Sequence, residues 1–131
     1  VGGPFPQSIN DNNNVGYAHF YDLDGNLITR LTEGRENDEY GYSVAVGSDR
    51  VVVGMPLGSI GGRAYLYDLD GNQIASLQAY DDSLGDRYGY SVAVGSGRIC
   101  VGAYANDGGS AYIYDFGESY DTYIESIVDA K

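Results

Sequence analysis

Carboxylate and amide side chains are the groups in this sequence whose spacing most resembles a chemical site, because one pattern of them occurs twice. The pattern contains Asp22, Asp24 and Asn26 in its first copy and Asp68, Asp70 and Asn72 in its second. Side-chain oxygens at alternate positions begin many calcium-binding loops, but the acidic residue that completes such a loop is missing here. Each copy also has an Asp-Gly pair, the strongest short-range sign of a two-residue hairpin turn. The pattern predicts tight turns, and calcium binding is the weaker alternative.

The residue types that most often perform catalysis are scarce. His19 is the only histidine and Cys100 the only cysteine, so the sequence offers no pair of such ligands for zinc. It also lacks a Gly-x-Ser-x-Gly segment and a phosphate-binding glycine loop that opens a helix. His19 stands where other copies of its strand have tyrosine, and Cys100 stands where another copy has Val52. We therefore predict a strand histidine, a small buried cysteine, and a non-catalytic protein without a cofactor.

Tyrosine is the most prominent side chain, with 14 copies. Most tyrosines recur by repeat, and most of these are predicted to pack inside the repeating unit; the recurring pairs are Tyr40 and Tyr88, Tyr42 and Tyr90, Tyr65 and Tyr112, and Tyr67 and Tyr114. Four others do not recur in this way: Tyr80, Tyr104, Tyr120 and Tyr123. Because tyrosine combines a large ring with a polar tip, these four are predicted to form a surface that contacts protein or sugar.

The charge and hydropathy of the chain limit the kinds of partner that it can bind. With 19 acidic and 7 basic residues the net charge is −12, which disfavours nucleic acid, since phosphate binding needs clustered Lys and Arg. No apolar run approaches the roughly 20 residues that cross a bilayer. The first residues, VGGPFPQSIN, lack the charged start and apolar stretch of a secretory signal, as a mature secreted chain also would.

One segment of 14 residues occurs twice, and the rest of the chain is divided into units around its two copies. Gly41–Gly54, GYSVAVGSDRVVVG, returns as GYSVAVGSGRICVG over Gly89–Gly102, with 11 of 14 positions identical. Apolar and small residues alternate up to a turn at Gly47-Ser48-Asp49, and the apolar run Val51–Val53 follows. This predicts a hairpin whose second strand is covered on both faces.

A second kind of hairpin surrounds each Asp-Gly pair. Its predicted strands are 18–22 with 27–31 and, at an offset of 46 residues, 64–68 with 73–77. A third version begins at Ser110, lacks Asp-Gly and ends in a predicted strand over 123–128. Nothing in the chain shows a sustained helical period.

Together the two hairpins make a unit of four antiparallel strands. We predict an all-β protein of about two and a half β-propeller-type blades within residues 16–131: a half blade at 16–32, a blade at 41–78 and a blade at 89–128. Residues 1–15 are predicted to be a linker, an N-terminal arm or an edge segment. Because a blade buries its faces against neighbours and this number cannot close a ring, the blades are expected to belong to a larger propeller or to a multi-chain or stacked assembly.

These units resemble the FG-GAP repeat, the blade of the integrin alpha-chain propeller. The resemblance rests on Tyr40-Gly41 and Tyr88-Gly89, on the triplets at Gly54 and Gly102, and on the segment SVAVG at 43–47 and 91–95. It implies propeller blades. The family's calcium loop, of the D-x-D-x-D-G type, lies between the first two strands, where this chain has only a four-residue connection. The resemblance therefore does not carry a calcium site to this protein.

Acidic, glycine-rich versions of the repeat look like those of surface and fibre proteins. We therefore expect a non-catalytic structural or assembly protein outside the cell: a surface fibre, an appendage, or a fibre or shell component of a virion. Its partners would be copies of itself or further blades of a longer chain. One alternative is an adhesion propeller that binds glycan or protein, with or without calcium. Another is the non-catalytic part of a longer enzyme.

Overall fold

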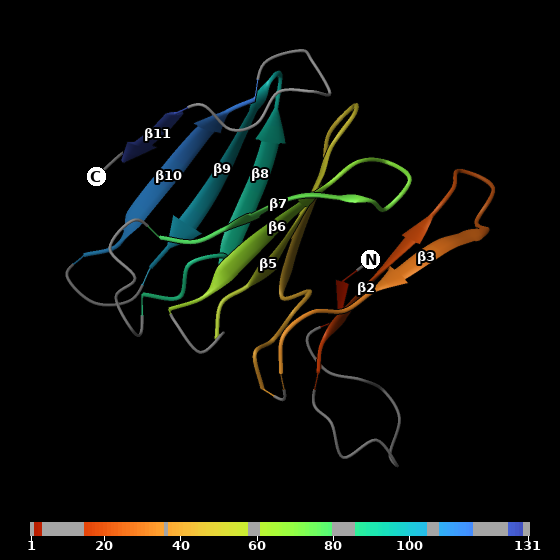
Figure 1. The fold of residues 1–131 in the computed structure, drawn as a ribbon, viewed down its shortest axis with the longest axis horizontal. Coiled ribbons are helices and arrows are strands. Elements are labelled where there is room, and N and C mark those ends of the chain that lie inside the picture. The colour runs from red at the N-terminus through yellow and green to blue at the C-terminus, as the bar shows by residue number, and fades with distance from the viewer. Residues whose placement is uncertain are drawn as a thin grey trace.

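The computed structural model describes residues 2–3, 15–35, 37–57, 61–79, 86–104, 108–116 and 126–129, and these form three antiparallel sheets (Figure 1). The strands are β1 (Gly2–Gly3), β2 (Tyr17–Tyr21), β3 (Leu27–Leu31), β4 (Ser43–Val46), β5 (Val51–Met55), β6 (Arg63–Tyr67), β7 (Gln73–Leu77), β8 (Ser91–Gly95), β9 (Arg98–Ala103), β10 (Ser110–Asp115) and β11 (Ser126–Asp129). The predicted all-β class is therefore confirmed.

The sheets repeat one connectivity. The second sheet has the order β4-β5-β6-β7 and the third the order β8-β9-β10-β11, so each is a four-stranded meander of the predicted kind. The first sheet has the order β1-β2-β3. The three sheets stack face to face along the chain and do not close into a ring (Figure 1).

Strand β1 occupies the place of a second blade strand, which the sequence analysis did not predict for these residues. Gly2 pairs with Ala18 in the register in which Gly54 pairs with Ala64 in the next sheet. This pairing agrees with the edge-segment interpretation for Gly2–Gly3. The signal was present in the sequence, because VGGP at 1–4 resembles VGMP at 53–56. The remaining residues up to 14 lie outside the described part of the chain.

The Asp-Gly hairpins form where predicted, but with a longer loop. Asp22 N–H donates to the Asn26 carbonyl at 2.9 Å, and Gly25 N–H donates to the Asp22 carbonyl at 3.1 Å. Gly25 has a φ of +84°, which glycine adopts without steric cost. These bonds define a three-residue loop that ends in a left-handed residue, rather than the predicted two-residue loop. The hairpin centred on Asp70-Gly71 has the same bonds.

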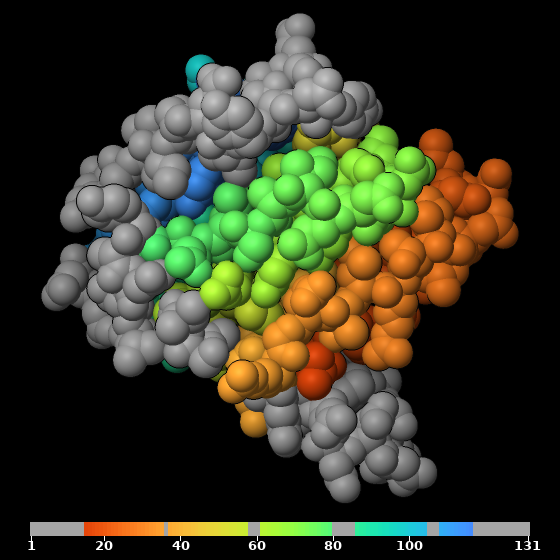
Figure 2. All heavy atoms as spheres, in the orientation of Figure 1, coloured from red at the N-terminus to blue at the C-terminus, as the bar shows by residue number. Residues whose placement is uncertain are grey.

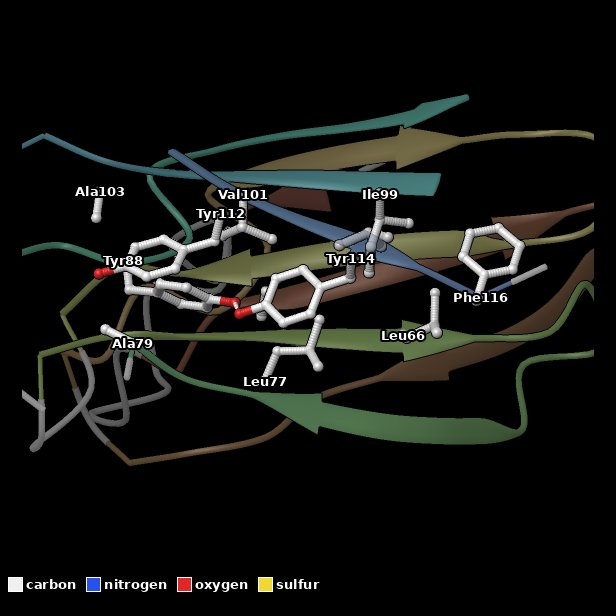
Figure 3. Packing of buried hydrophobic residues seen from close by; sticks show 12 residues of the cluster. Leu66, Leu77, Ala79, Tyr88, Ile99, Val101, Ala103, Tyr112, Tyr114 and Phe116 are labelled. Carbon is white, nitrogen blue, oxygen red and sulfur yellow. Dashed lines mark hydrogen bonds between the residues drawn. The ribbon is translucent and has the colours of Figure 1, made fainter. Parts of the chain in front are cut away.

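The second and third sheets share the larger core. Val52, Leu66 and Leu77 of the second sheet meet Ile99, Val101, Tyr112 and Tyr114 of the third, and Figure 3 shows many of these side chains between the two layers. Strand β5 is buried at every position, because its other face packs against the first sheet through Val51 and Val53. The prediction that this strand is covered on both faces is therefore confirmed.

Two glycines allow the backbones of these sheets to touch. A Cβ placed on Gly54 would lie 2.0 Å from the Gly89 carbonyl oxygen, and Gly89 itself has a φ of +90°. Beside this contact, the Ser43 hydroxyl donates to the same carbonyl at 2.7 Å. The aromatic-glycine pair Tyr88-Gly89, which begins the third blade, thus fixes the third sheet against the second.

A pair of buried tyrosines lies inside each blade. The hydroxyls of Tyr40 and Tyr67 are 2.6 Å apart, and those of Tyr88 and Tyr114 are also hydrogen-bonded (Figure 3). Burial raises the pKa of Tyr67 to about 12 and also raises the pKa values of the other three. These hydroxyls satisfy each other inside an apolar core, as buried polar groups must.

Candidate interaction surfaces

The outer face of the third sheet repeats the chemistry of a buried face without being covered. In the second sheet Val52, Ala64 and Leu66 are 0%, 0% and 1% exposed, because the third sheet lies on them. Their counterparts in the third sheet are only half-buried: Cys100, Ala111 and Ile113. The prediction that Cys100 is buried is therefore wrong, because no neighbouring sheet covers its side among the described residues. We call these three residues the third-sheet face.

The arginine at the first hairpin of each blade shows the same difference, being buried in the second sheet and exposed in the third. Arg50 is 1% exposed and its guanidinium lies 5.1 Å above the ring of Phe116 in the third sheet. Its counterpart Arg98 is 68% exposed and lies 3.8 Å from Asp115 of its own sheet. The third-sheet face therefore has an apolar centre and an arginine at its border, as the buried face has.

At the other end, a groove of about 260 Å³ lies between the first sheet and the second. Its lining comes from strands β2 to β5 and from the turn after β6: Ala18, His19, Phe20, Tyr21, Ile28, Val44, Val46, Val51 and Leu69. Apolar side chains thus dominate this first-sheet groove. Figure 2 shows the neighbouring outer strands, with β3 in orange beside β7 in green.

A row of aromatic rings crosses from the second sheet to the third. Tyr42 and Tyr90 have ring centroids 5.0 Å apart, and Tyr90 and Tyr104 have centroids 4.5 Å apart. Arg87 lies 5.5 Å above the Tyr104 ring. Hydrogen bonding to Tyr90 raises the pKa of the Tyr42 hydroxyl. Tyr42 and Tyr104 are 40% and 55% exposed, so this tyrosine row offers rings and hydroxyls to solvent.

The tyrosines that the structure exposes differ from those predicted to form a surface. Tyr104 is exposed, whereas Tyr80, Tyr120 and Tyr123 lie outside the described residues. Most of the recurring tyrosines were predicted to pack inside the blades, but Tyr42 is exposed and Tyr90 is only half-buried. The reason is the intervening glycine: with φ values of +85° and +90°, Gly41 and Gly89 reverse the alternation that would point both neighbouring tyrosines the same way. The other recurring tyrosines are buried as predicted.

The first aspartate of each repeated acidic segment uses its carboxylate within the turn. Asp22 accepts bonds from the backbone of Asp24 at 2.9 Å and of Asn26 at 2.8 Å, and its second oxygen accepts from the Asn26 amide at 3.0 Å. The second copy repeats this pattern at Asp68. These hydrogen bonds lower the pKa of both aspartates. Over the described residues, no three His, Cys, Asp or Glu side chains gather as a metal site.

His19 lies on β2, so the prediction of a strand residue is confirmed. Its ring lies between two tyrosines, with centroids 4.7 Å from Tyr17 and 6.0 Å from Tyr21. The Tyr21 hydroxyl is 3.4 Å from its Nδ1 atom. This aromatic set lies on the side of β2 where Tyr65 and Tyr112 lie on their strands.

Comparison with protein families agrees with the geometry. Residues 30–67 and 72–114 each match the FG-GAP repeat, and together they make up more than half of the chain. The chain belongs to the FG-GAP repeat family. In this FG-GAP protein the aromatic-glycine pair forms the lock between sheets, with tyrosine as the aromatic residue. A comparison with curated proteins found no match.

Two further observations bear on this FG-GAP protein. The connection between the first two strands of its second sheet is a tight turn, in which Gly47 N–H donates to the Arg50 carbonyl at 2.8 Å. This is the position where the family's calcium loop would lie. In the described part of the chain there is also no helix with the length and apolar character needed to span a bilayer.

Proposed function

We propose that this FG-GAP protein is a non-catalytic structural module that acts outside the cell and assembles end to end with copies of itself. The observation that carries the proposal is the third-sheet face, whose residues Cys100, Ala111 and Ile113 are counterparts of fully buried ones. Such a module suits a surface fibre, an appendage, or a fibre or shell component of a virion. The extracellular setting rests on the resemblance to acidic surface and fibre repeats.

The opposite end of the stack supplies a surface that could receive this face. Phe116, which receives Arg50 inside the molecule, corresponds to Leu69 in the second sheet and to Leu23 in the first. Leu23 is fully exposed, and Tyr21 beside it is 48% exposed. Placing the third-sheet face of one copy on the first sheet of another would continue the existing stack. An interface between two different surfaces generates either a ring or a fibre, depending on the rotation between copies.

Self-association is the expected result, and Ile113→Asp should abolish it. Sedimentation velocity over a range of concentrations should show growing oligomers of the wild-type chain. The aspartate should shift the population to monomer, because burying an unpaired carboxylate in an apolar interface is costly. Gln73→Glu adds the same charge at an exposed position on β7 and should leave association unchanged.

Monomer at every concentration for the wild-type chain would contradict the proposal. Equal oligomerisation of the two charged variants would contradict the assignment of the face. Circular dichroism should confirm that Ile113→Asp remains folded, which we expect because the side chain is only half-buried.

The tyrosine row favours a second candidate function, adhesion to a glycan or protein. Rings with hydroxyl groups and a nearby arginine are common in surfaces that bind such ligands. If the row binds glycan, Tyr104→Ala should reduce binding on an oligosaccharide array at least about fivefold, whereas Tyr21→Ala, an exposed tyrosine elsewhere, should not. Repeating the array with calcium and with chelator tests calcium assistance. Equal binding by both variants would contradict this role for the row.

A further inference from the structure

We propose that the tyrosine row is an oxidative modification site, at which Tyr42 and Tyr90 are joined ring to ring as a dityrosine that cross-links the second sheet to the third. The proposal goes beyond assembly and beyond ligand binding, because it concerns a covalent bond within one chain. It follows from how tyrosine rings meet at the junction of two adjacent sheets.

The two rings approach each other across this junction. Tyr42 comes just before β4 and Tyr90 just before β8, and these two strands pack against each other. The ring centroids are 5.0 Å apart and the ring planes are inclined by 38°. Hydrogen bonding to Tyr90 raises the pKa of the Tyr42 hydroxyl, so the hydroxyl ends of the rings meet. Because each ortho carbon is bonded to the carbon that carries the hydroxyl, this contact also brings the ortho carbons of the two rings close together.

Exposure to solvent distinguishes this pair from the tyrosine pairs inside the blades. Tyr40 and Tyr67 also meet through their hydroxyls, 2.6 Å apart, but their side chains are 0% and 1% exposed. Tyr42 is 40% exposed and Tyr90 is half-buried. An oxidant in solution can therefore contact Tyr42 without any opening of the fold, whereas the buried pair is shielded from it.

Tyr104 continues the row but is held in a different environment. Its ring centroid lies 4.5 Å from that of Tyr90, with the planes inclined by 52°. Arg87 lies 5.5 Å above the Tyr104 ring. A cation over an aromatic face is attracted by the electron density of the ring, so it disfavours removal of an electron from that ring. Oxidation is therefore favoured at Tyr42 and Tyr90 over Tyr104.

The reaction requires an oxidant that accepts one electron at a time, such as a haem peroxidase supplied with hydrogen peroxide. Each tyrosine loses one electron and its hydroxyl proton and becomes a phenoxyl radical, whose unpaired electron is shared with the ortho carbons. The two radicals combine by a carbon–carbon bond between ortho positions. The hydrogens on those two carbons then move as protons to the oxygens, which restores both phenols. The chain loses two hydrogen atoms, and one hydrogen peroxide becomes two water molecules.

The bond would close a loop that contains the whole second sheet. Residues 42 and 90 are 48 positions apart, and strands β4 to β7 all lie between them. A cross-link of this span restricts the unfolded chain, as a disulfide does, and so stabilises the folded state. This benefit suits the extracellular setting proposed above, although the chemistry itself does not depend on that setting.

The test is oxidation of the dilute folded chain, first with a haem peroxidase and hydrogen peroxide and then with photogenerated ruthenium(III) tris-bipyridine, a smaller one-electron oxidant. We expect the monomer to lose the mass of two hydrogen atoms and to gain the fluorescence of dityrosine. After proteolysis, the cross-linked peptides should contain residues 42 and 90. The linked monomer should melt at least about 5 °C above the untreated chain.

Three conservative variants separate this pair from the other exposed tyrosines. Tyr42→Phe should reduce the yield of linked monomer at least about tenfold, because phenylalanine forms no phenoxyl radical and the remaining rings are not held in this arrangement. Tyr21→Phe and Tyr104→Phe remove tyrosines that are 48% and 55% exposed, and both should leave the yield unchanged. All three variants keep the aromatic ring at an exposed position, so circular dichroism should show the wild-type fold.

Unfolding the chain tests whether the fold positions the two rings. In urea, the ruthenium oxidant should form the bond between residues 42 and 90 at least about tenfold less, because the rings are no longer held together. An equal yield in urea would overturn the assignment of the site to the folded junction.

Several results would contradict the proposal. It is overturned if neither oxidant removes two hydrogen atoms from the folded monomer, if Tyr42→Phe is linked in full yield, or if the peptides join Tyr90 to Tyr104. A linked monomer that melts at the temperature of the untreated chain would overturn the stabilising role of the bond. Sedimentation of the untreated chain tests end-to-end assembly separately, so either proposal can fail without the other.

Discussion

Gly54→Ala should destabilise the protein by about 3 kcal/mol, because the added methyl group has no space between the second and third sheets. Its position would lie 2.0 Å from the Gly89 carbonyl oxygen and 2.2 Å from the Ser43 hydroxyl. A backbone oxygen cannot move aside without separating the sheets. The hydrogen bond from Ser43 to that oxygen would be lost as well. Urea unfolding followed by circular dichroism measures the change.

Two other glycines provide matched controls. Gly95→Ala, also in a strand, should be neutral or slightly stabilising, because an added Cβ there meets nothing within 4 Å and glycine costs entropy on folding. Gly102 is the counterpart of Gly54 in the third sheet, where the nearest atom is the Ser91 hydroxyl at 2.3 Å. That side chain can rotate, so Gly102→Ala should cost less than Gly54→Ala. Equal losses at 54 and 95 would refute the packing explanation.

Raising the pH above 10 should unfold the protein cooperatively through its buried tyrosines. Burial raises the pKa of Tyr67 to about 12 and raises those of Tyr40, Tyr88 and Tyr114, against about 10 in an unfolded chain. Their stabilising effect is complete below pH 10 and is lost as the pH rises toward the folded-state values, because only the unfolded chain releases the protons. Each released proton lowers the free energy of unfolding by about 1.4 kcal/mol per pH unit.

Removing one hydroxyl pair tests this explanation. The double variant Tyr40→Phe, Tyr67→Phe should lose stability less steeply between pH 10 and 12 than the wild-type chain, as measured by urea unfolding at several pH values. At neutral pH, Tyr67→Phe alone should cost about 1–3 kcal/mol, because it leaves the Tyr40 hydroxyl buried without this partner. The double variant should cost less than the single one. Tyr104→Phe, at an exposed position, is the control, and a profile identical in all variants would show that other groups cause the alkaline loss.

The sequence was sufficient to predict the strands and hairpins because their signals are local and repeated. The Asp-Gly pairs, the glycine turns and the alternating segments each occur twice, so a chance pattern was unlikely to mislead. The loop after Asp22 was predicted one residue too short. The backbone conformation of Gly25 decides between the two loop types, and glycine allows both.

The interaction surfaces were harder to predict, because they depend on what lies beside a sheet rather than on the sheet itself. Val52 and Cys100 hold equivalent positions, yet among the described residues a neighbouring sheet covers Val52 and none covers Cys100. No local pattern contains that difference. Tyr42 was misplaced for another reason, since the positive φ of Gly41 breaks the strand alternation on which the prediction rested. Strand β1 was missed because two glycines show no alternation, and its one signal, the likeness of VGGP at 1–4 to VGMP at 53–56, is only four residues long.

The lock between Gly54 and Gly89 has a consequence for how such a chain can change length in evolution. The second and third blades each carry the serine and glycine that form this contact with a following unit, and also the tyrosine-glycine pair that receives it. Duplication or loss of one whole unit would therefore join surfaces that already fit, without any compensating substitution. Families built in this way are expected to vary in length by complete units, with insertions of other sizes confined to the loops.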